Sequence, residues 1–112
     1  MSGKYKFVLP DGIDQRFIDE MPDKGYISDA MVIGEDGTKY PVSFFDPVRL
    51  TQELECCVKL GQPYFTEPGI IVLPEVTMEN ILHAVDELGK EGFFEHTKPW
   101  SYKFELKKEK PE

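Results

Sequence analysis

The most suggestive spacing of chemically active side chains surrounds His83. Glu79 precedes it by four residues and Glu87 follows it by four, so on a helix all three side chains lie on one face. Imidazole and carboxylate groups at such spacing are able to ligate a divalent metal. This face is opposite the apolar stripe of the same segment, however, and a zinc site needs three or four converging ligands. The pattern therefore favours a solvated acidic face, and no metal or cofactor is predicted.

A second candidate for acid–base chemistry is His96, which follows Glu95 directly. A carboxylate beside a histidine can tune a general base near neutral pH. The preceding pair, Phe93 and Phe94, favours instead a segment anchored to the core by its aromatic rings. A small-molecule or metal-dependent enzyme using His83, His96 and nearby carboxylates stays an alternative, and it requires a pocket where these groups converge.

The cysteines and the short motifs give little support to catalysis. Cys56 and Cys57 are neighbours within a predicted helix, where side chains point about 100° apart, so a disulfide between them would be strained. The apolar stripe of this helix consists of Leu50, Leu54, Cys57 and Val58, so Cys57 is predicted to be buried. At Cys56, the nearby Glu53 and Glu55 disfavour a thiolate. The chain contains no phosphate-binding glycine loop, no Cys-x-x-Cys pair and no Gly-x-Ser-x-Gly elbow. A non-enzymatic protein is therefore the favoured interpretation.

Two segments indicate binding of a protein partner. The acidic segment 11–29 lacks the third ligand and the terminal Glu of an EF-hand, so it is either a solvated turn or an acidic patch. The loop 63–69 holds aromatic residues and a carboxylate between prolines, which reduce the entropy lost on binding. It is predicted either to plug the core or to form a contact surface with C-terminal aromatic residues. The candidate interaction residues are Tyr64, Phe65, Glu67, Trp100, Tyr102, Asp14, Asp19 and Glu20.

The charge of the chain is uneven. Its net charge is −8; residues 1–97 carry 18 acids and 8 bases (−10), and residues 98–112 carry five lysines and three glutamates (+2). An acidic body is a poor match for nucleic acid or an anionic membrane, but it suits a basic protein partner. No apolar run approaches the roughly 18 residues that a membrane span needs. The start of the chain does not resemble a signal peptide, and we expect a reduced, cytoplasmic protein.

N-cap residues predict the start of two main helices. Asp46 and Pro47 occupy the N-cap and first helical positions of a helix over 47–60, and Thr77 caps a helix that ends near Gly89 or Gly92. A shorter helical segment after Asp11, of at most two turns, is predicted to be closed by Pro22 and Gly25. Strands are predicted over 4–9, 26–33, 38–45, 70–73 and 100–106. The Asp36–Gly37 pair between the second and third of them predicts a hairpin. The uninterrupted apolar run 70–73 is predicted to be covered on both faces or central in the sheet.

These elements predict a two-layer α+β sandwich with a mixed, mostly antiparallel sheet of four or five strands and two main helices on one face. We expect a single domain over 1–106 and a frayed lysine-rich tail over 107–112. The favoured function is a protein-interaction module, one version being an immunity-type inhibitor that masks a basic partner. A homo-oligomer that pairs through an exposed sheet edge, at 26–33 or 100–106, is a further alternative.

Overall fold

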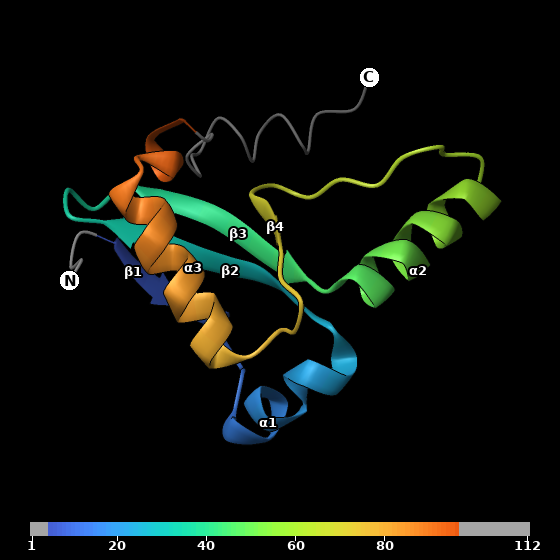
Figure 1. The fold of residues 1–112 in the computed structure, drawn as a ribbon, viewed down its shortest axis with the longest axis horizontal. Coiled ribbons are helices and arrows are strands. Elements are labelled where there is room, and N and C mark those ends of the chain that lie inside the picture. Colours follow the sequence, from blue (N-terminus) through green and yellow to red (C-terminus); the bar gives the residue numbers. More distant parts are fainter. Residues whose placement is uncertain (1–4, 97–112) are drawn as a thin grey trace.

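The computed structural model describes residues 5–96, which form one four-stranded mixed sheet, three α-helices and a final 3₁₀ turn (Figure 1). This confirms the predicted α+β class and the predicted order of the elements up to residue 96. The predicted strand 100–106 and tail 107–112 lie outside the described residues. The elements are β1 (Tyr5–Val8), α1 (Gln15–Lys24), β2 (Tyr26–Gly34), β3 (Lys39–Phe45), α2 (Pro47–Lys59), β4 (Ile70–Val72), α3 (Met78–Lys90) and η1 (Phe93–His96).

The sheet has the strand order β1-β2-β3-β4. β2 pairs antiparallel with both β1 and β3, and β3 pairs parallel with β4, as expected from a hairpin followed by a helical crossover. Two predictions are wrong. β2 lies between two strands, so within the described residues it is not a sheet edge. β4 has only three residues and lies at the edge of the four strands, with Ile71 directed to the core and Val72 49% exposed.

The predicted caps of the two longer helices are confirmed. The carboxylate of Asp46 accepts a hydrogen bond from the backbone N–H of Arg49 at 2.7 Å, and the hydroxyl of Thr77 accepts one from Asn80 at 3.1 Å. The predicted N-cap of α1 was three residues too early in the chain. Asp14, not Asp11, accepts the N–H of Phe17, because an N-cap side chain must lie just before the first turn.

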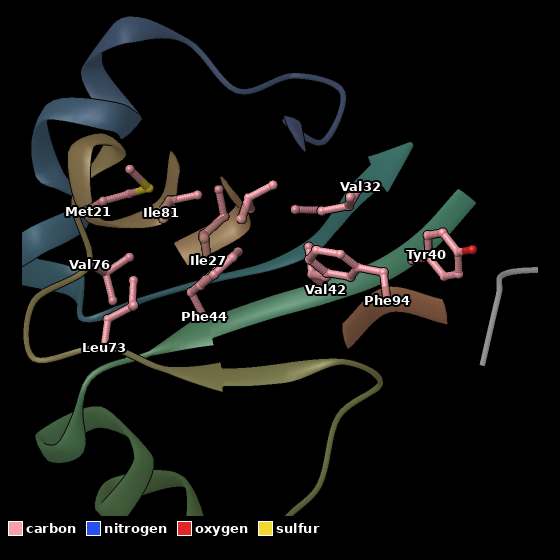
Figure 2. Close-up of a cluster of buried hydrophobic side chains, with 12 residues drawn as sticks. Met21, Ile27, Val32, Tyr40, Val42, Phe44, Leu73, Val76, Ile81 and Phe94 are labelled. Carbon is pink, nitrogen blue, oxygen red and sulfur yellow. The ribbon is translucent and has the colours of Figure 1, made fainter. Parts of the chain in front are cut away.

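The core lies between one face of the sheet and the helices α1 and α3 (Figure 2). Figure 2 shows Phe44 of β3, Met21 of α1 and Ile81 of α3 in one buried cluster, and each of them is fully buried. Phe94 closes the other end of the cluster against the ring of Tyr5, with ring centroids 5.1 Å apart. The prediction that the aromatic pair near the end of the described chain anchors it to the core is therefore confirmed.

The contact between β1 and η1 makes the free energy of unfolding decrease at alkaline pH. The hydroxyl of Tyr5 donates a hydrogen bond to Glu95 at 3.0 Å. Burial raises the pKa of Tyr5 above 10.0, and the hydrogen bond and negative charge of Glu95 raise it further. Below pH 10 the side chain is protonated in both states; above it, the unfolded chain loses the proton first, so stability falls as the pH rises.

We therefore expect the free energy of unfolding of the Tyr5→Phe variant to decline less steeply above pH 10 than that of the wild type. Urea unfolding between pH 8 and 11 provides the comparison, because every other tyrosine and lysine titrates equally in both proteins. Parallel pH profiles for the two proteins would show that Tyr5 titrates alike in the folded and unfolded states.

Candidate interaction surface

The exposed apolar side chains of the protein are concentrated in one continuous segment. Among the described residues, seven large apolar side chains are exposed, and six of them lie between residues 48 and 72. Isolated exposed apolar residues are normal on protein surfaces, but a concentration of them indicates an interaction site. We call residues 47–72 the arm. It comprises α2, the return segment that runs back to the sheet, and β4. Its exposed apolar residues are Val48, Leu54, Val58, Leu60, Tyr64 and Val72.

The arm extends away from the sheet. Figure 1 shows α2 pointing outward from the end of β3 and the return segment running back from its tip to β4. No residue of α2 is buried. The predicted apolar stripe exists, but Leu54 is 41% and Val58 is 55% exposed. The prediction that this stripe and Cys57 are buried is therefore wrong: Cys57 is half-buried, and both cysteines are free thiols.

The base of the arm is fixed by specific contacts. The backbone N–H of Asp46 donates to the carbonyl of Gly25 at 2.9 Å. The guanidinium of Arg49 lies 4.2 Å from the ring centroid of Tyr26 and forms an ion pair with Glu53 at 2.8 Å. A cation over an aromatic face is attracted by the ring quadrupole. The helix is thus held at its first turns, and the apolar side chains further along it are left in solvent.

The return segment places its three candidate residues differently. The ring of Phe65 packs edge-on against Phe45, with centroids 5.4 Å apart. The carboxylate of Glu67 accepts a hydrogen bond from the hydroxyl of Ser43 at 2.9 Å. Tyr64, in contrast, is 58% exposed. Phe65 and Glu67 therefore attach the loop to the sheet without entering the core cluster, and Tyr64 is left exposed. The contact surface with Trp100 and Tyr102 stays a prediction.

The acidic candidates lie on α1, next to the base of the arm. Asp14 caps this helix, and Asp19 accepts a hydrogen bond from the side chain of Gln15 at 2.9 Å. Glu20 forms ion pairs with the side chains of residues 16 and 24 on the same helix, at 3.1 and 3.7 Å. The side chains of Arg16 and Lys24 therefore neutralise part of the acidic surface of α1. Ion pairs between residues four positions apart are common on exposed helix faces.

The remaining candidates do not form a common site in the described part of the chain. Trp100, Tyr102 and the side chain of His96 lie outside it. His83 is exposed on α3, and so are the glutamates one turn before and after it. Within residues 5–96, no three His, Cys, Asp or Glu side chains are grouped to hold a metal ion. None of the helices described is both long enough and apolar enough to cross a membrane.

Comparison with known proteins adds no homologue to this picture. No protein family, characterised protein or solved structure matches the chain. The fold and the surface define the class: an α+β protein whose β3–β4 crossover forms an exposed apolar arm. Sequence reasoning missed Val48, Leu60 and Val72 as surface residues, since an apolar pattern does not reveal whether a neighbouring element covers it.

The exposure of the arm leads to a prediction for stability. We expect Leu54→Ser and Val58→Ser to change the free energy of unfolding by less than about 0.5 kcal/mol at low protein concentration, because both side chains are exposed. Val85→Ser on α3, where the side chain is only 3% exposed, should cost about 2 kcal/mol or more. Urea unfolding monitored by circular dichroism measures all three. Equal losses in all three variants would mean that the arm packs within its own chain.

Proposed function

We propose that this chain is a non-enzymatic protein-interaction module that binds a protein partner through the arm. The observation that carries the proposal is that six of the seven exposed large apolar side chains in the described residues lie in that one segment. Apolar and aromatic side chains of this kind supply most of the binding energy at protein interfaces. The anchored base of α2 supports the proposal further, since a surface held in place loses less entropy on binding.

The charge of the chain favours a basic partner. The net charge is −8, and the candidate acids Asp14, Asp19 and Glu20 belong to α1 and its N-cap; the C-cap of this helix, Gly25, is hydrogen-bonded to the base of the arm. A partner with basic groups around an apolar centre would meet complementary charge beside complementary apolar surface. Such complementarity accelerates association. An immunity-type inhibitor that masks a basic site on another protein is the specific form of this proposal.

The enzymatic alternative gains no support from the residues that suggested it. It requires histidines and carboxylates to converge in a concave site. His83 is instead exposed on α3, and the glutamates at positions 79 and 87 share its exposure. We therefore propose binding, and not catalysis, as the function.

The test is a comparison of three immobilised proteins in native cell lysate at low and high salt, read by mass spectrometry. We expect the wild type and the Leu82→Ser variant to retain the same basic protein at low salt and to release it at high salt. Leu82 is 49% exposed but lies on α3, outside the arm, so it is a matched control. The Leu54→Ser/Val58→Ser variant should retain several-fold less. Retention that is equal in all three proteins, or indifferent to salt, would refute this function.

A further inference from the structure

A second unpartnered apolar surface lies on the face of the sheet opposite the core. Side chains along a strand alternate between the two faces, so the residues between the buried core positions of β2 and β3 point away from α1 and α3. The strand register aligns them with residues of β1 in two rows. The rows are Val8–Met31–Pro41 and Lys6–Ile33–Lys39.

We call these six residues the open face. The apolar four are half-buried and the two lysines are exposed. Among the described helices, α1 and α3 contribute to the core on the other side, and α2 buries no residue. The return segment covers only the neighbouring part of this side, through its contacts to Ser43 and Phe45.

The composition of the open face is unusual for its position. A sheet with helices on one side normally presents polar residues to solvent on the other. Here the two rows contain four apolar residues, two lysines and no carboxylate, in a chain whose net charge is −8. The four apolar side chains are partly exposed, and no described helix packs on them. Partly exposed apolar residues side by side with two lysines form a candidate contact surface.

The arm has the complementary surface. On α2 the apolar stripe that includes Leu54 and Val58 is flanked by Glu53 on one side and Glu55 on the other, because successive residues turn by about 100°. Glu55 is exposed, while Glu53 also pairs with Arg49. The exposed carboxylate of Glu55 beside an apolar stripe is thus complementary to Lys6 and Lys39, which flank Ile33 in one row of the open face. The α2 stripe and the open face belong to the same chain, and the arm itself borders the open face at Gly69, which lies against the carbonyl of Pro41.

We propose that the arm binds the open face of a second copy of this chain, reciprocally, in a two-fold symmetric dimer. The inference rests on the proposed function in one respect, namely that the arm binds protein; a second copy and a basic partner would then compete for the same arm. Each copy would contribute the exposed side chains of its arm and the six residues of its open face, so the same contact would occur twice across the interface. Repulsion between the acidic copies is reduced at these two rows, which contain two lysines and no carboxylate.

The test is the molar mass of the full chain in solution, measured by sedimentation velocity between low and high micromolar concentration. The wild type should shift from 12.9 kDa towards twice that mass as the concentration rises. Leu54→Ser should raise the dimer dissociation constant about tenfold or more, and Leu82→Ser on α3 should not change it. Charge reversal identifies the contact: Glu55→Lys and Lys39→Glu should each weaken the dimer, and the two combined should restore it.

Three results would overturn the inference. The first is a wild type that stays monomeric at every concentration. In that case, reduced capture of a lysate protein by the Leu54→Ser/Val58→Ser variant would still support the proposed function without the dimer. A dimer unaffected by Leu54→Ser is the second, because it would use another surface. The third is a monomeric wild type that begins to dimerise through the arm in a Trp100→Ser/Phe104→Ser variant, which would assign the open face to the chain's own C-terminal segment.

Discussion

Gly69→Ala is expected to be among the most destabilising single substitutions in this protein, with a loss of about 4 kcal/mol or more in the free energy of unfolding. Gly69 has a φ of +61°, which disfavours any residue with a Cβ. A Cβ at this position would overlap the carbonyl oxygen of Pro41 and lie 3.1 Å from the Cα of Val42. These are backbone atoms of the central strand β3, so they cannot rotate away as a side chain would. The carbonyl of Gly69 also accepts the N–H of Ser43 at 3.2 Å, which starts the β3–β4 ladder.

Gly61→Ala is the matched control for this substitution. Gly61 also has a positive φ, +88°, but a Cβ there meets no atom within 4 Å. The change should therefore cost only the backbone strain, about 1 kcal/mol. Urea unfolding of both variants separates the two effects. Similar losses at the two positions would mean that β4 does not approach β3 as closely as described.

Phe44→Ala is the second substitution with a large expected effect, a loss of about 3–5 kcal/mol. Phe44 is fully buried in the middle of β3, and its ring packs edge-on against Phe7 with centroids 5.9 Å apart. Because it faces Ile27 on one neighbouring strand and Ile71 on the other, truncation leaves a cavity that the sheet cannot close. The measurement is urea unfolding against Tyr64→Ala, which removes an exposed aromatic side chain from the arm.

For Tyr64→Ala we expect less than about 0.5 kcal/mol, because the ring is 58% exposed. Equal losses for the two aromatic truncations would contradict the position of the core on the α1–α3 side of the sheet. They would also mean that the return segment is packed against its own chain.

Local sequence signals predicted most of the fold. The caps at Asp46 and Thr77 act through hydrogen bonds within three residues, so they can be recognised without knowledge of the rest of the chain. The same holds for the hairpin between β2 and β3, whose connection contains the Asp36–Gly37 pair and turns with Gly37 at a φ of +87°. Phe94 was predicted in the core because it belongs to a pair of adjacent aromatic residues flanked by polar ones, so the aromatic rings are the groups of this segment that favour burial.

The candidate surface could be predicted only in part, because its character depends on which elements come together. The stripe of α2 has the same spacing as the stripe of α3, yet Val85 is buried and Val58 is exposed. What differs is the neighbour: α3 packs on the sheet, whereas α2 leaves it at Asp46. Likewise, the run at residues 70–73 indicates a strand correctly, but its edge position follows from pairing with β3 alone. Periodicity indicates which residues share one face of a helix or strand, but it does not indicate whether another element covers that face.

The central claim is that the arm is uncovered by its own chain and binds protein. Amide hydrogen exchange of the full chain at a low and a high protein concentration tests this most directly. We predict that at low concentration the amides of α2 exchange much faster than those of α3, because only α3 is packed on the sheet. At high concentration α2 and the strands of the open face should become protected together, while α1 stays unchanged. Exchange in α2 that is as slow as in α3 at both concentrations would contradict the account, since the arm would then be packed within its own chain.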